Sequence, residues 1–181
     1  MKNILLLLLV SFSLPAFAQN DPQEVTPAIQ KKIRAEIDKA TIKLQAELKA
    51  GEKTPLQIGF SVDTFRVEKY FEQYTAYDYT TVGMVTAGYE AAHAYDSLLN
   101  KYYKKLLSKL KATDKTVLVQ AQKAWVAFRD AEEKLITAVS DDGYTGGGTV
   151  QHLVNVSQYL ELIKRRAIEI FEHLDRVSDQ F

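Results

Sequence analysis

The 181-residue sequence contains no cysteine, and it has only four prolines, two methionines and one tryptophan. Without cysteine the chain forms no disulfide, carries no thiol nucleophile and offers no thiolate to a metal. The fold must therefore be held by packing alone. An excess of either charge is also absent, because 23 Lys and Arg residues balance 23 Asp and Glu residues. This balance argues against nucleic-acid binding, which requires a basic surface.

A long apolar run occurs only at the start of the chain. Lys2 precedes the apolar stretch 4–14, and Ala16-Phe17-Ala18 fits the small-x-small rule for a leader-peptide cleavage site. We predict cleavage after Ala18 rather than a retained anchor, so that the mature chain starts at Gln19 with 22 basic and 23 acidic residues. No later stretch is apolar enough for a membrane helix. The sequence therefore predicts a periplasmic or secreted protein.

In most of the remaining chain, apolar residues recur at steps of three and four, which predicts helices. The predicted helices span about 27–50, 64–74, 81–111, 113–139 and 149–174. Thr26-Pro27, Thr113 or Asp114, and Thr149 are the expected helix starts. Residues 51–62 are expected to form a turn-rich connection. The predicted fold class is all-α, an antiparallel bundle of four to five helices without disulfides.

Two long helices define the expected core. The buried stripe of 81–111 is expected to be Val85, Gly88, Ala92, Tyr95, Leu99, Tyr102, Leu106 and Leu110. The buried stripe of 113–139 is expected to be Leu118, Ala121, Trp125, Phe128, Glu132, Leu135 and Val139. Gly83 and Gly88 are poor helix formers, so each is expected to allow a neighbouring helix to approach closely.

The segment Ala121–Glu132 places the single tryptophan beside several polar side chains. We interpret these groups as a structural network between helices, in which Arg129 pairs with Asp96 or Glu132. The predicted network consists of Asp96, Asn100, Tyr103, Gln122, Trp125, Phe128, Arg129 and Glu132. Two alternatives stay open: a ligand pocket formed by Asp96, Asn100, Arg129 and Glu132, or an acid–base pair of Asp96 and Glu132 as in glycoside hydrolysis.

Other chemical signatures are missing. His93, His152 and His173 lie on three different segments without metal-ligand spacing, and no Gly-x-Ser-x-Gly motif is present. The loop SDDGYTGGGT lacks the spacing of a calcium loop and the lysine of a phosphate loop. The sequence therefore predicts no catalytic residue, no metal and no cofactor.

The same loop is the candidate site for a protein partner. Four glycines between residues 143 and 148 interrupt the helical pattern, so the loop is either a simple connection or a binding tip on a rigid bundle. The candidate contacts are Asp141, Asp142, Tyr144 and Thr145. The aromatic segment 65–74 offers an alternative, an envelope scaffold protein that uses an exposed aromatic surface.

Residues 80–175 resemble the LprI-type lysozyme-inhibitor domain family, whose members are small exported helical proteins. The resemblance rests on Asp96, Leu99, Asn100, Tyr103, Gln122, Trp125, Phe128, Arg129, Asp130, Gly146, Gly147 and Arg166. Members commonly carry disulfide-forming cysteines, and Glu133 and Ala87 stand near two of their places. The family supplies no catalytic residue set.

The resemblance implies a non-enzymatic binding protein whose partner is a lysozyme-type muramidase. We expect residues 1–18 to be the leader, 19–79 a helical extension and 80–181 the LprI-like bundle. The expected mechanism is occlusion, in which the loop lies across the enzyme cleft. Because vertebrate-type lysozymes are basic, Asp141 and Asp142 would steer the association.

Overall fold

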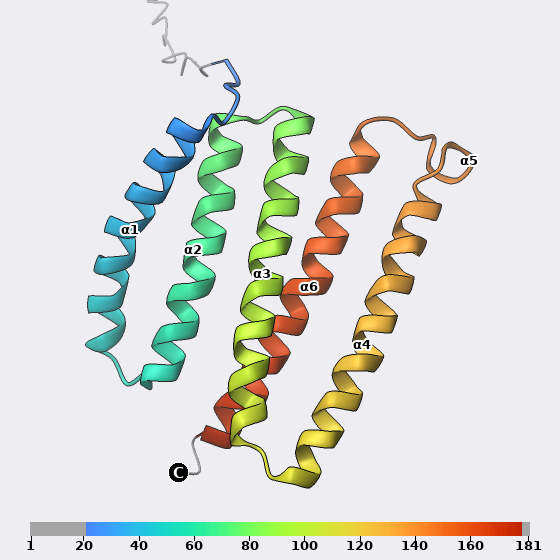
Figure 1. Ribbon diagram of the computed structural model, residues 1–181. Coiled ribbons are helices and arrows are strands. Elements are labelled where there is room, and N and C mark those ends of the chain that lie inside the picture. The colour runs from blue at the N-terminus through green and yellow to red at the C-terminus, as the bar shows by residue number, and fades with distance from the viewer. Residues whose placement is uncertain (1–20, 179–181) are drawn as a thin grey trace, which may run out of the picture.

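The computed structural model describes residues 21–178, which form five long helices and one short helix (Figure 1). The helices are α1 (Pro27–Lys49), α2 (Pro55–Tyr77), α3 (Thr81–Lys109), α4 (Ala112–Val139), α5 (Asp142–Thr145) and α6 (Val150–Ser178). The predicted all-α bundle is therefore confirmed. The predicted leader and its cleavage site lie outside the described residues.

The start of α2 differs from the prediction. Residues 51–62 were expected to be a connection, but α2 begins at Pro55. The Thr54 Oγ1 accepts a hydrogen bond from the Gln57 backbone N–H, and the Gln57 Oε1 accepts one from the Thr54 N–H, both at 3.2 Å. This reciprocal capping box fixes the helix start. The same Thr-Pro signal begins α1 at Thr26 and Pro27, as predicted.

The helices α3 and α6 form the centre of the bundle and run in the same direction (Figure 1). Gly88 faces Val156, and the Tyr102 and Phe171 ring centroids lie 5.5 Å apart. The residue numbers rise from the first contact to the second in both helices, so α3 and α6 are parallel. A β-carbon at Gly88 would lie 2.8 Å from the Cγ2 of Val156, so the predicted close approach at this glycine is confirmed. Consecutive long helices are antiparallel.

Two core clusters join the remaining helices to this centre. In the first, the Phe60 ring stacks on Phe171 at 3.8 Å and meets Tyr102 edge-on at 5.0 Å, linking α2, α3 and α6. In the second, Ile33 and Ile37 of α1 pack with Tyr74 of α2, Ala87 of α3 and Val25, which precedes α1. The aromatic part of α2 therefore packs inward. The exposed aromatic surface that the scaffold alternative requires is not formed there.

The inward face of α4 also differs from the prediction. This helix packs mainly on α6, and its buried residues are Leu118 and Ile136. The residues half-buried along the same stripe include Gln122, Trp125, Arg129 and Glu132. Four members of the predicted stripe are instead exposed: Ala121, Phe128, Leu135 and Val139. The cause is that α4 carries apolar residues on two adjacent faces, whereas α6 covers only one. Its start at Ala112, without a side-chain cap, also precedes the expected caps Thr113 and Asp114.

Candidate functional site

The chain between α4 and α6 folds into a compact loop at one corner of the bundle (Figure 1). The Asp141 Oδ1 caps α5 by accepting a hydrogen bond of 2.9 Å from the Gly143 N–H. After α5, the three glycines 146–148 have φ values of 78°, 65° and 89°. This left-handed region is costly for residues with a side chain. The Oδ1 of Asp142 also occupies the space that a β-carbon at Gly147 would need. The glycine run is thus required by the turn.

Polar contacts tie the loop to both of its flanking helices. The Thr145 Oγ1 donates to the Ser140 carbonyl at 3.2 Å, and the Asn155 Nδ2 of α6 donates to the Ser140 Oγ at 3.0 Å. Tyr144 belongs to the same loop and is 80% exposed. The loop is therefore ordered without a bound partner, and it presents one aromatic ring to solvent.

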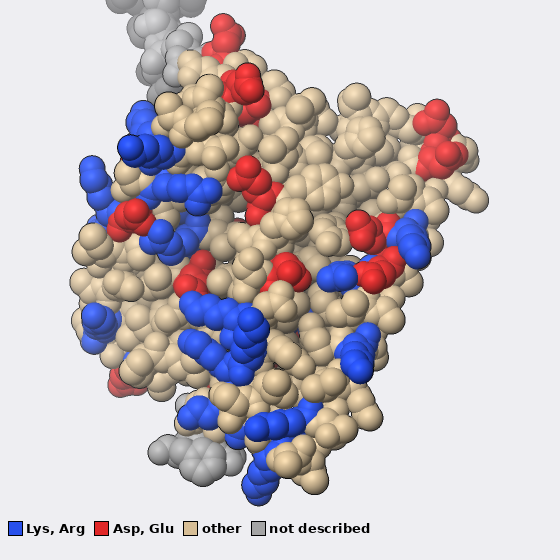
Figure 2. Space-filling view, in the orientation of Figure 1, with Lys and Arg blue, Asp and Glu red and all other residues tan. Residues whose placement is uncertain are grey.

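The four predicted contact residues lie together in this loop but have different surroundings. Tyr144 is the most exposed of the large apolar or aromatic side chains described. Thr145 is engaged with the Ser140 backbone, and Asp141 is engaged as a cap. Figure 2 shows acidic side chains gathered at the corner that carries α5, whereas the far end of the molecule is mainly basic. The corner therefore combines an exposed aromatic ring with negative charge.

A groove of about 640 Å³ lies between α4 and α6. Trp125 forms part of its wall, and the guanidinium carbons of Arg129 and Arg166 lie 5.6 and 5.9 Å from the centre of the indole ring. Such spacing permits cation–π attraction. Arg166 also donates from Nε to the Gln122 Oε1 and from a terminal nitrogen to the Glu169 Oε2, both at 3.1 Å. Trp125 is thereby fixed between α4 and α6.

The predicted polar network does not form as expected. Arg129 pairs with its neighbour Asp130 at 2.6 Å and not with Asp96 or Glu132. The Asn100 Nδ2 donates to the Asp96 carboxylate on its own helix, at 3.0 Å. The physical reason is that α4 leans on α6 more than on α3, so the groups on α3 and α4 do not interdigitate.

The remaining members of that predicted set are scattered. Tyr103 packs at the edge of the first core cluster, and Phe128 is 52% exposed. Glu132 lines the α4–α6 groove, but Asp96, Asn100 and Arg129 do not. The four groups required by the ligand-pocket alternative therefore do not share this cavity. Gln122 is paired with Arg166, a residue that only the family resemblance singles out in the sequence.

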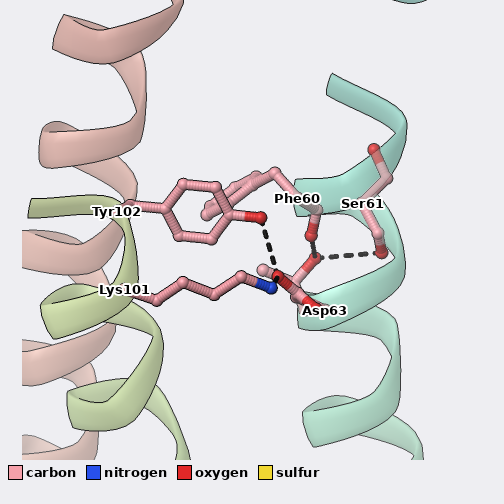
Figure 3. A network of polar contacts seen from close by, with 6 residues as sticks. Phe60, Ser61, Asp63, Lys101 and Tyr102 are labelled. Carbon is pink, nitrogen blue, oxygen red and sulfur yellow. Dashed lines mark hydrogen bonds and ion pairs between the residues drawn. The ribbon is translucent and has the colours of Figure 1, made fainter. Parts of the chain in front are cut away.

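Two further polar clusters join α2 to α3 and were not predicted. Figure 3 shows Lys101 and Tyr102 of α3 reaching toward Asp63 of α2. The Tyr102 hydroxyl donates to the Asp63 Oδ2 at 2.7 Å, and Lys101 pairs with the same oxygen. Tyr102 was expected in the core, and a buried phenol needs an acceptor. The sequence pattern does not identify that acceptor, because it does not show that α2 packs against Tyr102.

The second cluster repeats this arrangement. The Tyr95 hydroxyl and the Lys164 ammonium group both donate to the Glu68 Oε1. Burial raises the pKa of Tyr95, and the hydrogen bond to Glu68 raises it further. Burial also raises the pKa of Glu68, but the hydrogen bonds from Lys164 and Tyr95 outweigh it and leave this pKa below its ordinary value. At neutral pH the tyrosine is neutral and the glutamate charged, so the cluster is a structural clamp.

The comparison with known families decides the assignment. Residues 73–170, more than half of the chain, match the family described as lysozyme inhibitor LprI. The chain belongs to the LprI family. The match confirms the resemblance seen in the sequence, and LprI proteins are inhibitors of a lysozyme-type protein rather than enzymes. The matched LprI region contains α3, α4, the α5 loop and most of α6. No curated protein and no solved structure is significantly similar to this chain.

Within residues 21–178, no three His, Asp or Glu side chains are grouped so that they could hold a metal ion. None of the helices in that range is both long enough and apolar enough to span a membrane.

Proposed function

We propose that this protein is exported, binds a lysozyme-type muramidase and blocks the enzyme's cleft with the loop 140–149. The single observation that carries this proposal is the exposure of Tyr144, whose side chain is 80% exposed on the loop between α4 and α6. The family supports the partner class, because its members are described as lysozyme inhibitors. The proposed mechanism is steric, so the inhibitor needs no catalytic group.

The rigidity of the loop favours tight binding. A flexible loop loses conformational entropy when it is ordered against a partner, and this loss weakens the complex. Here the α5 cap, the glycine turn and the Asn155 hydrogen bond already hold the loop in one shape. An exposed tyrosine on such a scaffold suits a binding hot spot, because its large ring has few rotatable bonds.

The charge of the loop suits a basic enzyme. Asp141 and Asp142 lie at the acidic corner, whereas the C-terminal half of α3 carries four lysines: Lys101, Lys104, Lys105 and Lys109. The field of the molecule would therefore orient the loop, and not the opposite end, toward a basic cleft. Charges at the edge of an interface act mainly on the association rate.

The test is to measure the affinity of loop variants for lysozymes, with the chain 19–181. Tyr144→Ala is expected to weaken binding by roughly 30-fold, the size of a hot-spot loss of about 2 kcal/mol. Asp141→Asn keeps the Oδ1 acceptor that caps α5, so it removes the charge while the loop stays folded. This change is expected to slow association and to reduce its dependence on salt.

Asp114→Asn is the matched control, because it removes the same charge near the opposite end of α4. We expect its association rate to equal that of the wild type. If Tyr144→Ala and Asp141→Asn bind as tightly and as fast as Asp114→Asn, the loop is not the contact surface. Export is tested separately by N-terminal sequencing of the mature protein, which should begin at Gln19.

A further inference from the structure

A small cavity of about 190 Å³ lies where α1, α2 and α3 meet. It has charged groups of both signs, Arg34 of α1, Arg66 of α2 and Glu90 of α3. The rest of its lining consists of the Tyr70 ring and four apolar residues: Ile37, Val67, Ala91 and Ala94. Figure 2 shows a hollow in this face, bordered by basic and acidic side chains. The volume is that of about six water molecules.

The charges at the cavity differ in how they are compensated. Arg66 pairs with the Asp38 Oδ1 at 2.5 Å, so it is already neutralised. The Arg34 guanidinium carbon lies 4.8 Å from the centre of the Tyr70 ring, which fixes the cation without neutralising it. Within residues 21–178, neither Arg34 nor Glu90 forms an ion pair. The cavity thus presents one cation and one anion, each without a counterion.

Tyr70 provides a neutral wall between these charges. Its hydroxyl is buried and lies beside Glu90, although no hydrogen bond of regular geometry forms there. Burial and the nearby Glu90 raise the pKa of Tyr70 to about 12. The phenol is therefore protonated at neutral pH, and Glu90 is the one acidic side chain in the lining.

We propose that this cavity binds a free α-amino acid, whose carboxylate pairs with Arg34 and whose ammonium group pairs with Glu90. The amino-acid side chain would lie against Ile37 and Val67. A simple anion would gain contact with Arg34 but would meet the like charge of Glu90. A simple amine would face the reverse problem. A small zwitterion satisfies both groups, and the volume limits its side chain to a small or medium size.

The site is separate from the proposed inhibitory loop. Most of its lining, including Arg34, Arg66 and Tyr70, precedes residue 73 and so lies outside the region matched to the family. The inference therefore goes beyond the proposed function and does not depend on it. Muramidase binding by a Glu90 variant should equal that of the wild type, so the two proposals fail independently.

The test is a calorimetric or NMR titration of the chain 19–181 with L-alanine, D-alanine and L-valine. Propionate and ethylamine serve as probes that carry only the acid or only the amine. At least one amino acid is expected to bind about 10-fold more tightly than either probe, because a charge-assisted contact is lost in each probe. Equal binding of propionate and alanine would overturn the proposal, and so would failure of all three amino acids to bind.

Two variants test the assigned groups. Glu90→Gln is expected to bind alanine no more tightly than propionate, because the partner of the ammonium group is gone. Arg34→Gln is expected to lose at least about 10-fold in alanine affinity. The controls Glu161→Gln and Arg165→Gln make the same changes on α6, and they should bind like the wild type. The ratio of alanine to propionate affinity is the decisive readout, since a purely structural role of Glu90 would leave it unchanged.

Discussion

Gly88 of α3 packs directly against Val156 of α6, so its replacement tests the centre of the bundle. A β-carbon there would lie 2.8 Å from the Cγ2 and 3.1 Å from the Cγ1 of Val156. Val156 is 1% exposed, which leaves little room for its methyl groups to move. Overpacking of this kind lowers the free energy of unfolding by about 1–3 kcal/mol. Replacing glycine with alanine in a helix raises it by about 1 kcal/mol, which offsets part of that loss. Gly88→Ala is therefore expected to destabilise the protein by about 1 kcal/mol.

Gly59 provides a matched control for the same substitution. It also lies inside a helix, but the nearest atom to a new β-carbon is the Tyr102 hydroxyl oxygen at 3.9 Å. The helix propensity then acts alone, so Gly59→Ala should stabilise the protein by about 0.5–1 kcal/mol. One substitution at two helical positions is expected to change the free energy of unfolding in opposite directions.

A compensating change identifies Val156 as the cause. Val156→Ala alone leaves a cavity and should cost about 2 kcal/mol. In the double variant the new β-carbon at residue 88 enters that cavity, so the loss should be smaller than the sum of the single losses by about 1 kcal/mol.

The assay is urea unfolding, in which a shift of the midpoint at constant slope reports a change in stability. If Gly88→Ala stabilised the protein as Gly59→Ala does, the close packing of α3 on α6 would be refuted. Strict additivity of Gly88→Ala and Val156→Ala would refute the proposed contact between them.

Other predictions concern α4 and the polar clusters. Phe128→Ala should lower the free energy of unfolding by less than about 1.5 kcal/mol, because the residue is 52% exposed. A loss of about 3–5 kcal/mol in urea unfolding, as for a core phenylalanine, would show that Phe128 is buried as the sequence predicts. Arg129→Ala should cost only about 1 kcal/mol in the same assay, since its partner Asp130 is 52% exposed. Glu68 has a folded-state pKa below the ordinary 4.5, so the stability that its charged form contributes is present above pH 4.5 and is lost on acidification. Glu68→Gln should therefore weaken the fall of stability below pH 4.5. Burial and the hydrogen bond to Asp63 raise the pKa of Tyr102, so the stability that its neutral form contributes is present below pH 10 and is lost as alkali ionises the phenol. Tyr102→Phe should therefore reduce alkaline unfolding measured by circular dichroism. An unchanged unfolding profile would exclude Tyr102 as the group responsible.

Much of the fold follows from local patterns in the sequence. The stripe on α3 is correct because this helix is covered on a single broad face, where Tyr95, Leu99 and Tyr102 are each at most 2% exposed. The stripe on α4 is wrong because its apolar residues cover two faces, and periodicity does not indicate which face a neighbour covers. The start of α2 differs from the prediction because Gly51 and Pro55 are typical of a turn, whereas Thr54 and Gln57 form a capping box that begins the helix.

The contacts between helices were harder to predict. The chain order suggested antiparallel neighbours, but the most extensive contact joins α3 to α6, which are parallel. The partners of Tyr95 and Arg129 depend on this arrangement, so the sequence alone could not assign Glu68 and Asp130 to them. The loop residues Asp141 and Tyr144 are identifiable because the glycines between residues 143 and 148 interrupt the helical pattern there. Their role remains a prediction.

The most direct test of the central claim is to measure muramidase activity while the chain 19–181 is titrated into a panel of lysozymes. The account predicts that at least one enzyme is inhibited, that a saccharide occupying the cleft competes with the inhibitor, and that Tyr144→Ala requires a higher concentration for the same effect. Full activity of every enzyme at saturating protein would contradict the proposed inhibition. Inhibition that is insensitive to both the saccharide and Tyr144→Ala would contradict occlusion by the loop.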